Sequence, residues 1–455
     1  MKQLNSSFRD PDGFIFHSDE HLYRKINSSY LDEYRHLMNS GLYNHLVDEG
    51  LLISHEEMPE SRFPEHCDGL VIKPRLLNFI SYPYEWCFSQ LKLAAETTLK
   101  IQKIAFKYGM VLKDCSAFNI QFEGARPVFI DTLSFALYVK NKPWAPYKQF
   151  CQHFLAPLAL MTYNDLRLNN FFKIHLDGIP LDMASSLLPM RSYLNSSLLT
   201  HIHLHAKSQA YFSDGKSKAP IQNFSSNALQ GLMDSLESAI RKIKLPSTKT
   251  EWGNYYEDTN YLKDDFNFKH KTVQTFIETI KPETLWDLGA NNGLFSRIGS
   301  DSRTLTVAFD IDPLAVEKNF SDVRKQNTIN LLPLIMDLSN PSPSIGWAHS
   351  ERSSLFQRGP ADLVMALALI HHICIANNIP FDFVADYLSS ICRYLIIEFV
   401  AKEDSNAQRL LLSREDIFVN YNRKNFEETF SQGFEILRSE KIGDSHRTLY
   451  LMKAR

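Results

Sequence analysis

The sequence predicts an α/β protein whose C-terminal part is built on an open parallel sheet. The apolar run Thr284 to Leu288 leads into a glycine turn, residues 289–293, and then into a helix start. Two further apolar and β-branched runs, residues 303–312 and 330–338, follow at helix-length intervals, and each carries an acidic residue near its end. Strands that alternate with helices in this way favour a parallel sheet, whose carboxyl ends face one crevice.

The turn after the first of these strands is suited to holding a ligand by its backbone. Gly289 can adopt a positive φ where the strand ends, and Gly293 allows helix and sheet to approach closely. Asn291 stands where dinucleotide-binding turns usually carry a glycine, and Asp287 just before the turn favours a cationic or amino-bearing ligand over a pyrophosphate. S-adenosylmethionine (SAM) is such a ligand. A motif this short is also consistent with a simple strand-to-helix connection.

Acidic residues follow the next two strands as well. Asp310 comes about 20 residues after Gly289, the spacing expected for a carboxylate that binds ribose hydroxyls. Asp337 lies at the carboxyl end of the third strand. We therefore expect Asp287, Asp310 and Asp337 to converge on one crevice.

On these residues the segment from Trp252 to the C-terminus resembles a class I SAM-dependent methyltransferase domain, and the longer pattern is similar to the nodulation-protein-like methyltransferase family. The stretches that carry the resemblance are WDLGANNG, AFDIDP, MDLSNP, ADLVMALALIHHI and SHRTLYLMKAR. It implies a Rossmann-like, doubly wound, seven-stranded sheet with SAM as cofactor. It also implies cofactor-binding residues, with Asp287, Gly289 and Gly293 around the methionine side, Asp310 on the ribose, and Asp337 near the adenine, and Asn291 of the same turn is a further cofactor-binding candidate.

A histidine pair, His371 and His372, follows the fourth predicted strand, residues 361–369. In the fold that the resemblance implies, this position faces the methyl group. A neutral imidazole there could take a proton from the attacking nucleophile, which makes both residues catalytic candidates. The alternative is that the pair caps the following helix or packs beneath the adenine.

The N-terminal part contains the spacing D-x-x-x-x-N at Asp114 and Asn119, followed by a hairpin turn and a strand that ends in Asp131. This order is similar to that of protein-kinase-like phosphotransferases, in which the first Asp orients a hydroxyl while the Asn and the second Asp hold Mg²⁺. If such a site is active, these three residues would be its metal and catalytic groups. We accordingly interpret residues 1–246 as a kinase-like α+β accessory domain and residues 247–455 as the methyltransferase domain.

Several features depart from the kinase pattern. Leu112 and Lys113 stand where His-Arg usually precedes the first Asp, and the N-terminal hairpin has no glycine-rich loop. Lys25 and Lys73 are the candidates for a phosphate-binding lysine, and neither is placed unambiguously. The alternative is that the three polar side chains satisfy backbone groups of their own turns.

Other N-terminal elements follow from periodicity. Residues 8–26 predict a hairpin, residues 29–49 one amphipathic helix, and residues 88–108 a buried helix. The run THIHLHA, residues 200–206, alternates histidines in the manner of a strand. Its histidines could form a metal site, or they could be ordinary buried or surface side chains.

Composition excludes several classes of function. The 455 residues suggest two or three domains, and a formal charge of −3 provides no field that would attract a polyanion. No Lys/Arg-rich run with interleaved aromatic residues is visible, so nucleic acid is not expected as a partner. The six cysteines lack C-x-x-C spacing, and neither a metal centre nor a disulfide framework is expected.

The N-terminus lacks the apolar core of a signal peptide, and no apolar run is long enough to cross a bilayer. We therefore expect a cytoplasmic protein that does not span a membrane. The predicted function is SAM-dependent methylation of a small-molecule or glycan nucleophile, with O-methylation as the expected chemistry. The alternative is a bifunctional or non-catalytic protein whose N-terminal domain binds nucleotide or phosphorylates a substrate.

Overall fold

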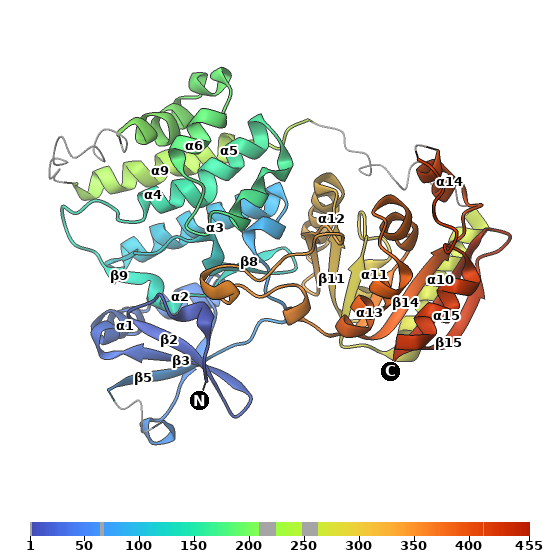
Figure 1. The fold of residues 1–455 in the computed structure, drawn as a ribbon. Helices are drawn as coiled ribbons and strands as arrows, with labels where there is room; N and C mark the ends of the chain where they lie inside the picture. The colour runs from blue at the N-terminus through green and yellow to red at the C-terminus, as the bar shows by residue number, and fades with distance from the viewer. Residues whose placement is uncertain (1, 64–67, 209–223, 248–262, 413) are drawn as a thin grey trace. The chain divides into compact units, whose positions relative to one another are not determined.

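The chain forms two compact units in a computed structural model that describes residues 2–63, 68–208, 224–247, 263–412 and 414–455 (Figure 1). The first unit consists of Met1–Phe122, Arg126–Thr248 and Ile345–Arg352, and the second of Glu123–Ala125, Lys249–Ser344 and Ser353–Arg455. The predicted boundary between residues 246 and 247 adjoins residues 248–262, which lie outside the described ranges, and it stays a prediction.

The first unit contains a five-stranded antiparallel sheet with strand order β1-β2-β3-β5-β4. Its strands are β1 (Lys2–Gln3), β2 (Gly13–Ser18), β3 (His21–Asn27), β4 (His55–Glu57) and β5 (Gly69–Pro74). The predicted N-terminal hairpin is confirmed as β2–β3, whose register pairs Phe16 with Tyr23. These two rings stack at 5.7 Å and pack with Phe63 in the core beneath the sheet.

Helices make up most of the rest of the first unit. They are α1 (Leu31–Asn39), α2 (Leu42–Asp48), α3 (Phe88–Lys107), α4 (Tyr147–Phe150), α5 (Ala156–Tyr163), α6 (Leu181–Leu187), α7 (Ser196–Leu198) and α9 (Ser226–Lys242). Two short strand pairs join them, β6 (Met110–Leu112) with β9 (Phe135–Leu137) and β7 (Ile120–Glu123) with β8 (Arg126–Phe129). The expectation of one helix over residues 29–49 is wrong, because Gly41 adopts φ +85° and separates α1 from α2.

The alternating histidines lie in helix and not in a strand, so the strand expectation for THIHLHA is also wrong. His201 and His203 belong to a π-helical turn, Leu199–Leu204. His201 hydrogen-bonds the hydroxyls of Tyr147 and Ser235, both at 2.8 Å. His203 stacks on Tyr193 with ring centroids 3.7 Å apart. Within the described ranges no group of three or more His, Cys, Asp or Glu side chains could hold a metal ion.

The second unit is a mixed α/β structure built on the seven-stranded sheet that the sequence predicts. The strand order is β12-β11-β10-β13-β14-β16-β15, and β10 to β14 run parallel while β16 is antiparallel to both of its neighbours. The strands are β10 (Thr284–Leu288), β11 (Leu305–Asp310), β12 (Leu331–Ile335), β13 (Ala361–Ala366), β14 (Cys392–Val400), β15 (Phe434–Lys441) and β16 (Arg447–Ala454). Edge strand β12 contains Pro333, and edge strand β15 has an irregular register between Ile436 and Arg438.

Helices cover both faces of this sheet. They are α10 (Lys263–Ile280), α11 (Ser296–Asp301), α12 (Pro313–Gln326), α13 (Phe381–Ile391), α14 (Ser405–Leu411) and α15 (Arg423–Gly433). On one face Phe276 of α10 and Ile298 of α11 pack on Ile396 of β14. On the other, Phe399 of β14 contacts Phe426 of α15 at 5.0 Å. Neighbouring residues of β14 thus point to opposite layers, as the pleat requires.

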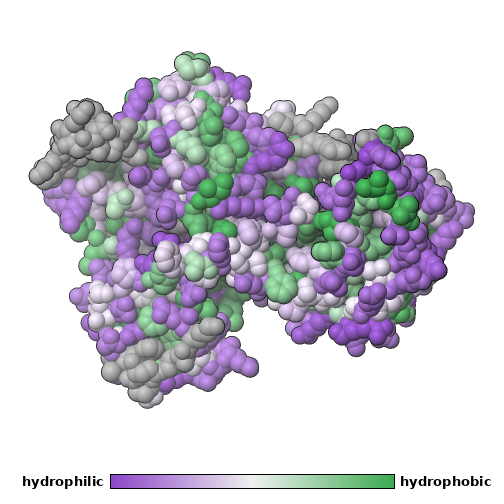
Figure 2. All heavy atoms as spheres, in the orientation of Figure 1, coloured by the Kyte–Doolittle hydropathy of each residue, from purple (hydrophilic) through white to green (hydrophobic). Residues whose placement is uncertain are grey.

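On the face of the second unit that Figure 2 shows, most of the surface is polar, but apolar atoms are exposed around α14. Leu412, Ile417 and Val419, which follow the end of that helix, are 85%, 61% and 80% exposed. Among the helices of the described residues, none has the length and apolar character that crossing a membrane needs.

Candidate functional site

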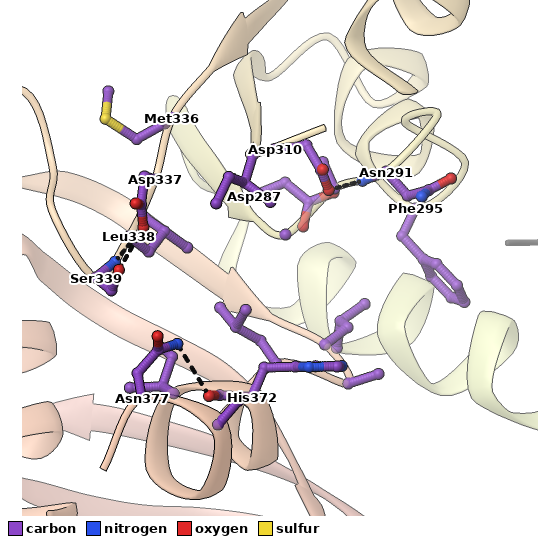
Figure 3. A pocket seen from close by; sticks show the side chains of 18 of the residues that line it. Asp287, Asn291, Phe295, Asp310, Met336, Asp337, Leu338, Ser339, His372 and Asn377 are labelled. Atoms are coloured by element: carbon purple, nitrogen blue, oxygen red, sulfur yellow. Dashed lines mark hydrogen bonds between the residues drawn. The ribbon is translucent and has the colours of Figure 1, made fainter. Parts of the chain in front are cut away.

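The carboxyl ends of four neighbouring strands, β10 to β13, line a cavity of about 280 Å³ in the second unit (Figure 3). Three acids line this cavity: Asp287 lies in β10, Asp310 ends β11, and Asp337 lies in the segment after β12. The sequence predicted that these three acids converge, and the cavity lining confirms it. Which group of a ligand each acid binds stays a prediction.

The glycine turn after β10 is held against β11 by its own backbone. The amides of Gly289 and Ala290 both donate to the carbonyl of Phe309, each at 2.9 Å. Gly289 and Asn291 adopt left-handed conformations, φ +75° and +50°, and both line the cavity. Asn291 tolerates this conformation better than most non-glycine residues, and its amide donates to Asp310 Oδ2 at 2.7 Å.

Gly293 lies behind the cavity lining, where the turn meets α12. Its φ is +78°, and a Cβ atom at this position would lie 2.3 Å from Asn319 Nδ2. This contact fits the expectation that Gly293 serves close packing between elements. Its contribution to a ligand site would therefore be to the shape of the turn.

Asp287 and Asp310 are both almost completely buried, at 2% and 8% exposure. Burial raises the pKa of Asp287 to about 7, although Ser296 Oγ donates to its Oδ2 at 2.6 Å and opposes the shift. Burial likewise raises the pKa of Asp310 to about 6, against the amides of Asp312 and Asn291 that donate to it. Two buried carboxyl groups that line the same cavity would be stabilised in their ionised forms by a cationic ligand.

Asp337 has a different environment from the other two acids. It is only partly buried, and its Oδ1 accepts from the amide and the hydroxyl of Ser339, at 2.8 and 2.6 Å. Figure 3 shows it beside Met336 and Leu338, which also line the cavity. Asp337 thus combines contact with solvent and with Ser339 with two apolar neighbours.

Lys269 of α10 is a cavity residue that the sequence interpretation missed. Its side chain is 3% exposed, and Nζ donates to Glu398 Oε2 at 2.6 Å and lies 4.8 Å from the ring centre of Phe295. Burial lowers its pKa, against the attraction of Glu398. A signal existed in the sequence, because Lys269 occupies the apolar face of its helix between Phe266 and Val273.

The two candidate histidines have different environments, although their ring centroids are only 4.2 Å apart. His372 lines the cavity, and burial together with the charge of Arg447 lowers its pKa to about 4. His371 is fully buried and is not part of the lining, and among the residues that the structure describes neither of its ring nitrogens has a hydrogen-bond partner. Burial keeps the pKa of His371 well below its ordinary value. Both imidazoles are therefore neutral at pH 7, and only His372 faces a space in which a ligand could lie.

The predicted acids of the first unit accept hydrogen bonds from backbone amides of their own turns, and Asp114 also accepts one from a distant side chain. Asp114 Oδ1 accepts from the amide of Ser116 at 2.9 Å and from Gln149 Nε2 at 2.7 Å. Asp131 Oδ1 accepts from the amide of Leu133 at 3.1 Å. The structure thus provides the backbone contacts that the simpler sequence interpretation expects.

An arginine that the sequence interpretation missed neutralises the last of these acids. Arg24 of β3 forms ion pairs with Asp131 at 2.5 Å and with Asp10 at 2.6 Å. The candidate Lys25 instead pairs with Asp68. Asn119 Nδ2 donates to Ser134 Oγ at 3.3 Å. The carboxylate that a kinase-like site would use for Mg²⁺ is therefore already paired with a cation of the chain.

Comparison with known proteins gives one near full-length relative. The nodulation protein NoeA of Rhizobium meliloti (strain 1021) is 36% identical over 458 residues, which cover 98% of this chain and 95% of that protein. No protein-family model matches the chain.

Solved structures match part of the chain at low similarity. Magnesium protoporphyrin IX methyltransferase (ChlM) from Synechocystis PCC 6803, with bound SAH, has a TM-score of 0.31 at 15% identity and covers 44% of this chain and 89% of its own. The bifunctional kinase-methyltransferase WbdD has a TM-score of 0.30 at 16% identity over 42% of this chain, which spans only 40% of WbdD. The methyltransferase domain of bacterial CtHen1-C has a TM-score of 0.31 at 12% identity and covers 42% of this chain and 98% of its own. Scores of this size decide nothing about activity.

Proposed function

Because the chain belongs to the family of the nodulation protein NoeA and carries two buried acids around a glycine turn, we propose that it is a SAM-dependent methyltransferase. The observation that carries the proposal is the pair Asp287 and Asp310 at the carboxyl ends of adjacent parallel strands, in a cavity with a buried lysine. This is the position at which open α/β sheets bind ligands.

The charges of the cavity fit the cofactor. Asp287 suits the ammonium and sulfonium groups, and Lys269 suits the carboxylate of the same amino acid moiety. Asp310 stands at the strand end from which a carboxylate binds ribose hydroxyls. Ile311 and Leu338 supply apolar walls for an adenine ring, with Asp337 as a hydrogen-bond acceptor beside them.

Bound SAM would supply an activated methyl group for in-line transfer to a nucleophile. The contribution of this chain would be to orient the reactants and exclude water, which the apolar wall of Leu367, Leu369 and Ile373 supports. His372 is neutral and faces the cavity, so its ring could hold the proton that a hydroxyl loses. Its low pKa makes it a weak base until an acceptor changes its surroundings.

The acceptor that we propose is a nucleophile, most simply a hydroxyl group, on a small molecule or glycan. The net charge of −3 and the absence of a basic run argue against a nucleic acid. No observation favours phosphotransfer by the first unit, because Asp131 is paired with Arg24.

The test is calorimetric titration of SAM into the wild-type protein and into Asp310→Ala. We expect binding that the substitution weakens by about 1.5–3 kcal/mol, the range for a hydrogen bond to a charged group. Asp444→Ala is the matched control, because Asp444 is exposed in the turn before β16 and should leave affinity unchanged. A folded wild-type protein that binds no SAM would contradict the proposal.

A further inference from the structure

A buried carboxylate behind the cavity, Glu398, connects two parts of its wall. The pairing of β13 with β14 ends at Ala366 and Ile397, so Glu398 is the first residue of β14 beyond its pairing with β13, while β16 still pairs with it on the other side. It lies on the same face of the sheet as Ile396, the face that α10 covers, and is completely buried. Its carboxylate therefore lies directly behind residues that line the cavity.

Both oxygens of Glu398 are engaged. Oε2 accepts from Lys269 Nζ at 2.6 Å and from the amide of Ala368 at 2.8 Å. Oε1 contacts Arg447 Nη1 at 3.3 Å. Arg447 is itself held by Asp404 through two hydrogen bonds, at 2.7 and 3.0 Å. The buried group thus contains two cations and two anions, which balances its charge.

Ala368 needs such support because of its backbone conformation. Its φ is +49°, a left-handed conformation that is unfavourable for alanine, and it lines the cavity between Leu367 and Leu369. A non-glycine residue keeps this conformation only where its surroundings determine it. The hydrogen bond to Glu398 is a contact of this kind, and it fixes the loop that follows β13.

We propose that Glu398 is the positioning residue for the amino acid end of the cofactor, because it holds the Lys269 ammonium and the Ala368 backbone in one arrangement. The inference rests on the proposed function. It assigns the carboxylate of the ligand to Lys269, and it makes the orientation of that lysine depend on Glu398. Arg447 and Asp404 then act by holding Glu398.

Two ligands that differ only at the amino acid end separate positioning from general structural support. S-adenosylhomocysteine (SAH) carries the whole amino acid moiety, whereas 5′-methylthioadenosine has the same adenosine and a thioether but no ammonium or carboxylate. The experiment is calorimetric titration of both ligands into the wild type, Glu398→Gln and Ile397→Val. The last variant is the control, because Ile397 is buried in the same strand and points to the other face.

We expect Glu398→Gln to weaken SAH by about tenfold or more while it changes methylthioadenosine less than about twofold. Ile397→Val should change neither. Equal weakening of both ligands, or no change in either, would overturn the proposal. Failure of the wild type to bind SAH or methylthioadenosine would instead remove the proposed function, and the inference with it.

A double-mutant cycle tests the route through Lys269. Lys269→Met should weaken SAH selectively, and Glu398→Gln added to it should cause little further loss, because the two residues act as one unit. Additive losses would overturn the proposal. If Glu398→Gln does not fold, Glu398→Asp serves the same purpose, because it keeps the charge and shortens the reach to both partners. It should show the same selective loss.

Discussion

Burial makes Asp287 and Asp310 hold protons more strongly than ordinary carboxyl groups do, with pKa values of about 7 and about 6 against 3.8. A folded-state pKa that lies above the unfolded value means that the folded protein binds more protons over this range. The ligand-free protein therefore loses stability as pH rises from about 4 to about 7. A cationic ligand reverses the cost, because it favours the ionised acids.

The first prediction is that the affinity for SAM increases with pH. Between about pH 5.5 and about 7.5 we expect a gain of about tenfold or more, because binding at the lower pH must release protons from the two acids. His372, with a pKa of about 4, does not titrate in this window. Calorimetry across the range measures the effect, and Asp287→Asn should flatten it. An affinity that is constant or falls with pH would contradict the assignment.

The second prediction concerns Gly293. We expect Gly293→Ala to lower the free energy of unfolding by about 2–4 kcal/mol, because the new methyl group meets the Asn319 side chain and alanine disfavours a φ of +78°. Urea denaturation measures the loss. Gly433→Ala is the control, because the same atom at Gly433 makes only an ordinary contact of 3.5 Å with Ser389. Similar values for both variants would show that the close packing at Gly293 is unimportant.

At the scale of elements, the strands of the second unit could be predicted because each one combines an apolar composition with a regular place in the order of strands and helices. The apolar runs that became β10, β11 and β12 are buried throughout most of their length and end beside acids, a pattern with few alternatives. The same reasoning failed at residues 200–206, because alternation of histidines does not distinguish a strand from a helix whose polar groups find partners. Gly41 broke a helix whose periodicity continued through it.

The site was predictable only where its residues follow strands. Asp287, Asp310 and Asp337 could be found because sequence order places strand ends together. Lys269 and Glu398 could not be paired in the same way, because they come from a helix and a strand 129 residues apart. Arg24 could not be paired with Asp131 from the sequence, because the two residues come from distant segments and such an ion pair has no local signature.

The third prediction belongs to the contact of β3 with the turn at Asp131. We expect Arg24→Gln to destabilise the first unit by about 3–5 kcal/mol, because it leaves Asp10 and Asp131 largely buried without their cation. Chemical denaturation measures the change. Lys103→Gln is the control, since its pairs with Asp234 and Glu237 are exposed and should matter by less than about 1 kcal/mol.

The pH dependence gives that prediction a second readout. Burial raises the pKa of Asp131, and Arg24 and Ser134 more than offset this, so the pKa lies below its ordinary value. The stabilisation that ionised Asp131 contributes is fully present at pH values above its pKa in the unfolded state, and it is lost as the pH falls below about 4. The difference between wild type and Arg24→Gln should therefore shrink in acid. An unchanged difference would indicate that charge is not the cause.

At the scale of the whole molecule, the chain consists of two units with separate cores. The fourth prediction is that SAM protects amides of the second unit selectively in hydrogen exchange. Peptides that cover residues 287–296 and 305–312 should exchange more slowly, because binding stabilises the fold by about 2.7 kcal/mol at a ligand concentration 100 times Kd. Peptides of the β2–β3 hairpin should not change. Protection of the hairpin alone would place the ligand in the first unit.

The two edges of the seven-stranded sheet have a consequence for self-association. An unpaired edge strand invites another chain to add to it, which is one route to aggregation. Pro333 gives β12 one donor fewer, and β15 combines an irregular register with exposed charges at Glu435, Arg438 and Lys441. Both outer strands therefore resist extension by a neighbour. At high concentration we therefore expect the edges of this sheet to contribute little to self-association.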